Sequence, residues 1–369
     1  MLRCMAPDHR VRRIRVGAPH QTAAGMIFSI LRWAAWIRRR LAIASGRNRT
    51  IYVKDRRDEY IALWRNAATA IGATCGPLSE EVCEITLGDR KTRVLTYLVQ
   101  FDDPVVLGLA GDKAFCYGVA DRLGIPTPEP RTLDRTALGR AWRSLSLDGA
   151  PLVVKPAEGT GSGVGVSIDV GSRYALAEAL ALASLFADRV VVERMVPAES
   201  VRLLFLDGQM IHAVRRSGVR IVGDGRSTIR RLLNAQGVSV DLRIRQTLAR
   251  QGLTPEDIVP ADGSIVARWV RPSSVSSHEE RTVYDEDVTA LVGRPLIDEV
   301  APLVSAIGTR FAGVDLLTND PTRSLAESGG VFLEVNTTPG LHHHCRPATG
   351  GSCAVAESVL RALLDEPAA

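Results

Sequence analysis

The sequence lacks several features that would assign it to a specialised class of protein. No stretch of about 18 apolar residues occurs, so it predicts no transmembrane helix. No small-x-small cleavage site clearly follows the apolar run near the N-terminus, so we expect no secretory signal. No internal repeat or low-complexity tract stands out. The composition, with 46% hydrophobic and 24% charged residues, is typical of an ordinary globular protein.

Cysteines are few, and their spacing is irregular. None of them forms a CxxC pair, and the six are Cys4, Cys75, Cys83, Cys116, Cys345 and Cys353. In a chain of 369 residues this pattern predicts free thiols in a reducing compartment. The localisation that we expect is therefore cytoplasmic.

Acidic residues are almost absent from the first 50 positions. This segment holds eleven Arg, no Lys and a single acid, Asp8, a balance of +10. The whole chain carries +5, so the remaining residues sum to −5. The sequence pI near 9.0 thus belongs to the N-terminal segment. We expect no nucleic-acid groove in the body of the protein and no nucleic acid among its partners.

Apolar residues within this basic segment fall on one helical stripe. Ile30, Trp33, Ile37 and Leu41 recur at helical spacing, with arginines at 38–40 beside them. One interpretation is a basic helix that rests on an anionic membrane surface. The other is a helix docked on its own domain or on a sister subunit in a homo-oligomer. We favour docking, because a single basic helix is a weak membrane signal.

Helical and strand patterns alternate through the rest of the chain, so the fold class is α+β or α/β. Residues 1–46 are expected to form a basic extension and 47–110 a small N-terminal α/β domain. Residues 111–369 form the main domain, with one lobe at 111–188 and another at 189–369. The expected helices cover 59–71, 113–123, 173–187, 297–311 and 354–364. The expected strands cover 50–53, 82–87, 93–99, 151–155, 190–193, 201–206, 209–214, 314–318 and 331–335.

A glycine-rich segment follows a β-rich run that ends at Lys155. Glycines let backbone N–H groups turn toward an anion, and Lys155 adds a positive charge, so the segment suits a triphosphate. It matches neither the GxxxxGK[ST] loop nor a dinucleotide fingerprint. The alternative is a flexible hairpin turn. The residues of this segment are Gly159, Gly161, Ser162, Gly163 and Gly165.

Acidic and amide side chains occur on two expected strands near the C-terminus. Glu334 and Asn336 are two residues apart and therefore share a strand face, and a hairpin would bring Asp315 close to them. Carboxylate and amide oxygens are hard ligands that suit Mg²⁺, with Mn²⁺ as an alternative, and not Zn²⁺. A solvated acidic strand explains poorly why these residues end an apolar run.

The segment VVVERMV at 190–196 is a strand that runs directly into a short linker. Adenine is often held at such a place, because a backbone carbonyl and N–H imitate a base-pairing edge. Glu193, Arg194 and Val196 would be the residues of this hinge. Without its context the segment predicts only a buried strand.

These motifs occur in the order seen in ATP-grasp enzymes. The sequence resembles most closely the ATP-grasp domain of cyanophycin synthetases and of bifunctional glutathione synthetases. The resemblance runs from about residue 101 to 364. The segments that carry it are GDKAFCYGVADRLGIPTPEP at 111–130, VERMVPAESVRLLFLDGQMIHAVRR at 192–216, GDGRSTIRRLL at 223–233 and EVNTTPGL at 334–341.

The resemblance implies an ATP-grasp fold, with ATP held between two α+β lobes. It implies a ligase that phosphorylates a small-molecule or peptide carboxylate and joins it to an amine, with release of ADP and phosphate. Lys113 and Lys155 would hold phosphates under residues 159–165. The other implied sites are adenine at Glu193, Arg194 and Val196 and magnesium at Asp315, Glu334 and Asn336.

Arginines that follow the hinge are candidates for holding the acyl phosphate or a substrate carboxylate. Arg202 and Arg215 are the best of these, because the guanidinium group offers a bidentate fork. The alternative for each is a surface ion pair.

The substrate side departs from the family pattern. Relatives carry Ser-Thr-Gly-Gly where this sequence has Ser-Ser-His-Glu at 276–279, so the acid and the amine stay unidentified. An ATP-grasp phosphotransferase and a non-catalytic nucleotide-binding protein remain alternative functions. His342, His343 and His344 next to Cys345 could form a metal site. We favour a loop that contacts substrate, because successive residues of an extended loop rarely share one metal.

Overall fold

The structure is a computed structural model that describes residues 23–44, 57–147, 151–160, 164–216, 219–240, 242–261, 263–268, 285–345 and 353–365. The strand predicted at 50–53, the 276–279 segment, and Gly161, Ser162 and Gly163 of the glycine-rich segment lie outside the described residues. The mixed α/β class that the sequence predicts is confirmed, and the sheets are antiparallel. The domain boundaries predicted at 46, 110 and 188 stay predictions.

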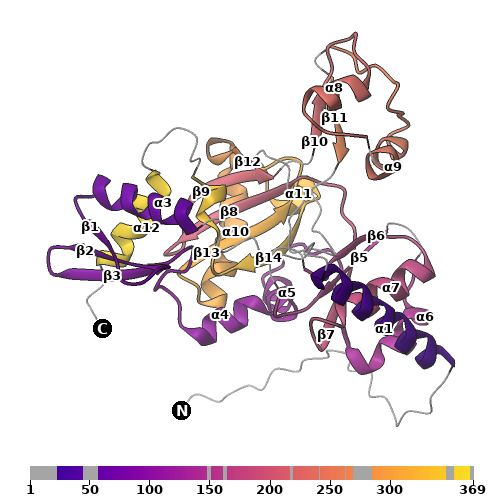
Figure 1. Cartoon of the computed structure of the whole chain (residues 1–369), viewed down its shortest axis with the longest axis horizontal. Coiled ribbons are helices and arrows are strands. Elements are labelled where there is room, and N and C mark those ends of the chain that lie inside the picture. Colours follow the sequence, from indigo (N-terminus) through magenta and orange to yellow (C-terminus); the bar gives the residue numbers. More distant parts are fainter. Residues whose placement is uncertain are drawn as a thin grey trace.

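A five-stranded sheet, ordered β12-β9-β8-β13-β14, forms the larger body (Figure 1). Alternate side chains of its strands, such as Leu203 and Phe205, pack against the helices on one face. The strands are β8 (Ser200–Leu206), β9 (Gln209–Arg216), β12 (Asp285–Asp287), β13 (Phe311–Leu317) and β14 (Val331–Asn336). The helices on this face are α4 (Pro104–Gly111), α5 (Lys113–Arg122) and α10 (Arg294–Ile307).

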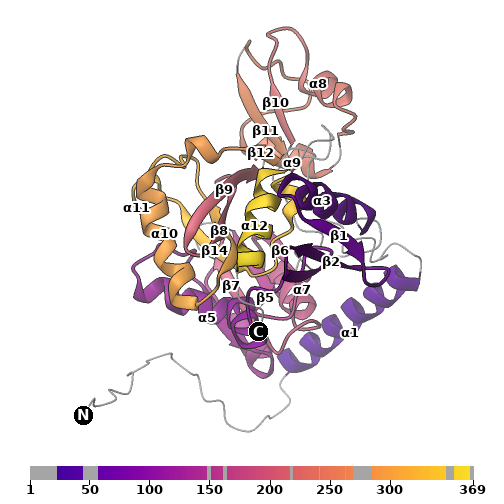
Figure 2. The ribbon, with the colours of Figure 1, turned by 90° about the vertical axis from the view of Figure 1, so that its left-hand side faces the viewer.

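The opposite face of this sheet is apolar at one end only. Leu204, Leu206 and Phe311 join a second core with residues 60–101 and the C-terminal helix, which lie side by side in Figure 2. Arg202 and Asp315 lie on this same face, farther along the strands. The elements of the second core are α3 (Arg57–Ala70), β1 (Thr74–Pro77), β2 (Val82–Leu87), β3 (Arg90–Leu95) and α12 (Ala354–Asp365).

A second sheet, ordered β4-β7-β5-β6, forms the other lobe. Val154 and Val192 point into a core with the helices, whereas Lys155 and Glu193 alternate with them and face away from that core. The strands are β4 (Arg131–Asp134), β5 (Leu152–Pro156), β6 (Ser167–Val170) and β7 (Arg189–Arg194). The covering helices are α1 (Ala23–Ala44), α6 (Leu138–Ser144) and α7 (Arg173–Ala183).

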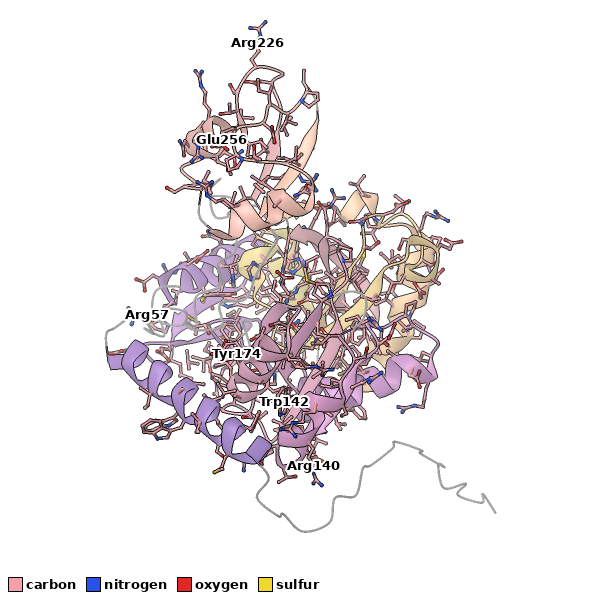
Figure 3. All side chains as sticks on the ribbon, turned by 90° about the vertical axis from the view of Figure 1, so that its right-hand side faces the viewer. Arg57, Arg140, Trp142, Tyr174, Arg226 and Glu256 are labelled. Atoms are coloured by element: carbon pink, nitrogen blue, oxygen red, sulfur yellow. A yellow bond between two sulfur atoms is a disulfide. The ribbon has the colours of Figure 1, made fainter. Side chains whose placement is uncertain are left out.

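A small projection is built from β10 (Val219–Val222), α8 (Ile229–Ala235), α9 (Leu242–Arg250) and β11 (Ser264–Arg268). It has its own apolar cluster, which includes Ile221, Leu233 and Leu248. Figure 3 shows it standing away from both lobes, with Arg226 near its tip. The remaining short elements are η1 (Arg135–Ala137), η2 (Thr289–Leu291), α11 (Leu325–Ser328) and η3 (Leu341–His343).

Several predicted elements have different bounds in the structure, and two of them differ by three residues or more at both ends. The helix predicted at 297–311 ends at Ile307, because Gly308 adopts a left-handed conformation (φ 87°) and strand β13 begins at Phe311. The strand predicted at 93–99 covers Arg90–Leu95 instead. The two-residue turn at 88–89 leads directly into it, and Thr96, with φ 52°, ends it.

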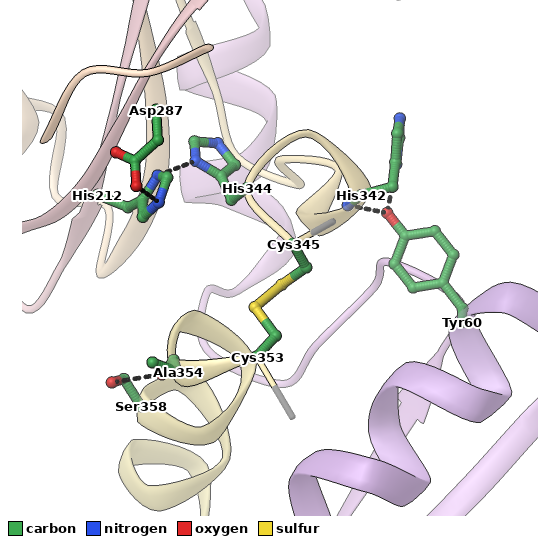
Figure 4. Close-up of a disulfide and its surroundings, with 9 residues drawn as sticks. All are labelled: Tyr60, His212, Asp287, His342, His344, Cys345, Cys353, Ala354 and Ser358. Carbon is green, nitrogen blue, oxygen red and sulfur yellow. Dashed lines mark hydrogen bonds and ion pairs between the residues drawn. A yellow bond between two sulfur atoms is a disulfide. The ribbon is translucent and has the colours of Figure 1, made fainter. Parts of the chain in front are cut away.

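The prediction that the cysteines are free is wrong for one pair. Cys345 and Cys353 form a disulfide, with Cα atoms 5.5 Å apart (Figure 4). The chain returns after β14 so that the residue before α12 meets the end of η3, a proximity that sequence spacing does not reveal. Among the described cysteines, Cys75, Cys83 and Cys116 are free.

Helix α1 is docked on its own chain, as favoured from the sequence. It contacts α7 and α6 and buries Phe28 in their core. The docked face differs from the expected stripe, because Ile30 and Trp33 are 65% and 66% exposed. Within the described residues, no helix combines the length and the hydropathy needed to span a membrane.

Replacing Phe28 with alanine should destabilise the protein by about 3 kcal/mol, because a buried aromatic ring leaves a cavity. Trp33→Ala is the matched control on the same helix and should change stability by less than about 0.5 kcal/mol, because Trp33 is exposed. Urea unfolding of the two variants compares these effects. Equal destabilisation by both substitutions would show that α1 does not dock through Phe28.

Candidate active site

Lys155 lies at the end of β5 in a buried polar cluster between the lobes. Its Nζ is 2.9 Å from Glu193 Oε2 and donates to the Tyr117 hydroxyl, also over 2.9 Å. The Tyr117 hydroxyl donates in turn to Glu193 over 2.8 Å. Burial, with the charge of Glu193, raises the pKa of Tyr117 well above its usual value, so the phenol stays neutral. The cluster holds the lysine head in a fixed position.

Lys113 approaches the same region from the first turn of α5. Its backbone N–H donates to the Ala157 carbonyl over 2.9 Å, which ties the start of this helix to the chain just after β5. Its ammonium lies 3.5 Å from Glu334 on β14. Two buried lysines, each beside a carboxylate, therefore stand where the two lobes meet.

Asp315 is the centre of a third cluster, on the polar half of the large sheet. It lies opposite Arg202 on β8 and Glu334 on β14 in the strand register. Arg202 donates to it through Nε and Nη2, at 2.5 and 2.6 Å, while Arg216 Nη1 lies 3.4 Å away. The amide of Asn336 donates to the same carboxylate over 3.2 Å. The structure therefore contains the predicted pairing of these two strands, with Asp315 opposite Glu334 and next to Asn336.

The described ends of the glycine-rich segment require glycine. Gly159 and Gly165 have φ of 71° and 77°, a conformation that other residues rarely adopt. A Cβ atom on Gly165 would lie 2.7 Å from the Phe186 ring and 2.8 Å from Pro156. The backbone at Gly165 therefore lies so close to Pro156, at the end of β5, that a residue with a side chain would not fit there.

The predicted hinge lies at the end of β7, but its first side chain is engaged elsewhere. Glu193 points to Lys155, so only its backbone is available to a ligand at the hinge. The Arg194 N–H donates to the Pro128 carbonyl over 2.9 Å, and its guanidinium pairs with Glu129. Val196 accepts from the N–H of Ala198 where the chain turns.

Arg215 is not part of the Asp315 cluster. Its guanidinium pairs with Glu199 and Glu286, at 3.3 and 3.5 Å. The structure offers Arg216 in its place. The cause is a register shift between β8 and β9 near Leu204, which moves the face of β9 by one residue. Arg216 and Tyr117 are the residues that sequence reasoning missed. Strand alternation gave no signal for Arg216, because an unbroken register favours Arg215.

The histidines that follow β14 point in different directions. The Tyr60 hydroxyl lies 2.7 Å from Nδ1 of His342, and Nδ1 of His344 lies 3.1 Å from Nδ1 of His212. Cys345 is in the disulfide. In the described part of the chain, no group of three or more His, Cys, Asp or Glu side chains is placed to hold a metal.

The donor set around Asp315 fits a magnesium ion by its chemistry. Two carboxylates and an amide supply only oxygen ligands, and Asp315 and Glu334 lie directly opposite each other on paired strands. The lysines and arginines beside these acids supply countercharge for phosphate groups as well. Asp315, Glu334 and Asn336 are therefore the residues that would hold the ion.

Comparison with known proteins finds relatives that are similar to part of this chain. Residues 120–224 match the family described as D-ala D-ala ligase C-terminus. The cyanophycin synthetase of Crocosphaera subtropica is 26% identical over 302 residues, which cover 75% of this chain and 33% of that protein. The bifunctional glutathione biosynthesis protein GshAB of Streptococcus thermophilus is 29% identical over 263 residues, or 66% of this chain and 34% of that protein.

The fold is also that of a solved structure. The bifunctional glutathione synthetase from Pasteurella multocida superposes with a TM-score of 0.51 at 21% identity, covering 80% of this chain and 44% of that one. The chain spans about a third of the length of the two sequence relatives that it matches. The sequence matches and the two-lobed fold with lysines between the lobes agree. The chain has the fold of ATP-grasp ligases and is similar to them in sequence.

Proposed function

We propose that this protein is an ATP-dependent carboxylate–amine ligase that forms an amide or peptide-like bond through an acyl phosphate. The observation that carries the proposal is the convergence of four buried cations, Lys113, Lys155, Arg202 and Arg216, where the two lobes meet. A cluster of cations at such a place suits a bound polyphosphate, because the phosphates supply negative charge to several cations at once.

Each residue has a distinct task in this mechanism. Lys113 and Lys155 bind the phosphates of ATP, and the glycine-rich segment at 159–165 covers them and excludes water. Magnesium bound by the Asp315 set would neutralise phosphate charge and align the β and γ groups. The hinge at Glu193, Arg194 and Val196 lines the adenine.

The arginines act on the carboxylate substrate. Its oxygen attacks the γ-phosphorus, ADP leaves, and an acyl phosphate remains beside Arg202 and Arg216. The guanidinium groups bind this anion and stabilise the charge that develops when an amine attacks the acyl carbon. Phosphate then leaves and the amide forms. The substrates that we propose are a small-molecule or peptide carboxylate and an amine.

Hydroxylamine tests the acyl phosphate directly. With Mg-ATP and a panel of amino acids and short peptides, the enzyme should convert an accepted acid to a hydroxamate and release ADP and phosphate. Lys155→Ala and Glu334→Ala should each reduce this by at least ~100-fold, because phosphate and metal binding are lost. Release of AMP and pyrophosphate would indicate adenylation, and a stable phosphorylated product without amine use would indicate a kinase.

A pair of adjacent variants tests the arrangement of the arginines. Arg216→Gln should lower the rate of hydroxamate formation by ~100-fold, because the side chain faces the Asp315 cluster. Arg215→Gln should cost less than about tenfold, because Arg215 pairs with Glu199 and Glu286. ATP binding to both variants is measured separately by calorimetry. The reverse order of the two losses would restore Arg215 as the substrate-binding arginine.

A further inference from the structure

Three side chains from separate segments form a chain of contacts beside the arginine cluster. His212 Nε2 lies 3.5 Å from Asp287 Oδ2, and His212 Nδ1 lies 3.1 Å from His344 Nδ1 (Figure 4). His212 is on β9, Asp287 is on the neighbouring β12, and His344 follows η3. The Asp287 side chain is 64% exposed, whereas His344 is buried. The chain of contacts therefore leads from the interior to solvent.

The contacts determine which ring nitrogens carry protons. A neutral His212 with its proton on Nε2 points that proton at the Asp287 carboxylate, and its Nδ1 is then an acceptor. His344 must donate from Nδ1 to satisfy this acceptor. The Nε2 atom of His344 is left with a lone pair. This atom is buried and has no hydrogen-bond partner among the residues that the structure describes.

The surroundings of His344 keep its ring neutral. Burial, with the positive charges of Arg202, His212 and Arg216, holds the pKa of His344 well below its usual range, and Asp315 acts weakly in the opposite direction. Burial also lowers the pKa of His212, although Asp287 opposes this. A depressed histidine pKa means that the neutral form persists as pH falls below 6.5, so one ring nitrogen of His344 keeps its lone pair throughout the neutral range.

The proposed reaction needs such a group. An α-amino group has a pKa of roughly 8 and is mostly a charged ammonium at pH 7, with no lone pair for attack on an acyl phosphate. The described carboxylates of the site, Glu193, Glu334 and Asp315, are each paired with a cation. His344 lies close enough to Arg202 and Arg216 for their charges to lower its pKa. Its Nε2 atom has a lone pair to offer.

We propose that His344 is the general base for the amine substrate and that His212 and Asp287 complete a proton relay to solvent. This inference rests on the proposed ligase function. The ammonium gives a proton to His344 Nε2, the proton on His344 Nδ1 passes to His212 Nδ1, and the proton on His212 Nε2 passes to Asp287. The freed nitrogen lone pair forms the bond to the acyl carbon, the bond from that carbon to the phosphate oxygen breaks, and the leaving phosphate takes the second proton from the nitrogen. In this relay His344 is the residue that takes the proton from the amine, and His212 and Asp287 are positioning residues.

The strength of the attacking base provides a selective test. Hydroxylamine is a weak base that is uncharged at pH 7, so it needs no general base, whereas an aliphatic amine does. With an acid accepted in the hydroxylamine panel, His344→Gln should reduce amide formation with the preferred amine by ~100-fold and leave hydroxamate formation within about threefold. His212→Gln and Asp287→Asn should give smaller losses of the same selective kind. Raising the pH should partly restore amide formation by His344→Gln.

Tyr60→Phe is the matched control for a loosened loop. It removes the hydrogen bond to His342 on the same loop without changing the relay, and it should affect the two nucleophiles equally. Equal losses with both nucleophiles in His344→Gln would overturn the relay. Absence of hydroxamate with the wild-type enzyme would instead contradict the ligase function, so the two failures are distinguishable.

A measurement without substrate tests the proton positions. In ¹⁵N NMR spectra of the full chain between pH 6.5 and 8, His344 should be neutral with its proton on Nδ1, and His212 neutral with its proton on Nε2. His344→Gln identifies the first set of signals. A proton on Nε2 of His344 would remove the proposed base and would overturn the inference whatever the enzyme's activity.

Discussion

The ion pair between Arg202 and Asp315 organises the site. These residues lie opposite each other in the β8–β13 register, so the pair is fixed by the sheet and both side chains are buried. A buried carboxylate without a partner would be costly, and a second cation, Arg216, shares it. Strands β9, β8 and β13 each therefore contribute one side chain to the same charge cluster. The apolar core occupies only the other end of that face.

In both sheets, alternate residues of one strand serve different purposes: one set packs in an apolar core, and the other set carries the charged groups of the candidate site. In β5, Val154 packs against α7 in the helical core, and the next residue, Lys155, faces the opposite lobe. In β8, Phe205 packs under α10 while Arg202 lies on the other face. The same short segments thus hold the hydrophobic layers together and present charges to the space between lobes, which explains how a small number of strands supplies most of the site.

Much of this arrangement could be predicted from the sequence, because it depends on local periodicity. Asp315, Glu334 and Asn336 meet because two apolar strands form a hairpin, and residues two apart share a face. The choice between Arg215 and Arg216 could not be predicted. An unbroken register from the turn at Asp207 would place Arg215 with Arg202, and the shift near Leu204 reverses this. The disulfide and the His212–His344 contact join segments far apart in sequence, which periodicity does not address.

The disulfide between Cys345 and Cys353 restrains the loop that contains His344. His344 is followed directly by Cys345, which is bonded to the residue preceding α12, and that helix is part of the core beneath the large sheet. The disulfide thus links the loop that contains His344 to the large sheet that carries Asp315. Lys155 and the glycine-rich segment belong to the other lobe. Motion between the lobes would move Lys155 relative to Asp315 but leave His344, the arginines and Asp315 in a constant mutual arrangement.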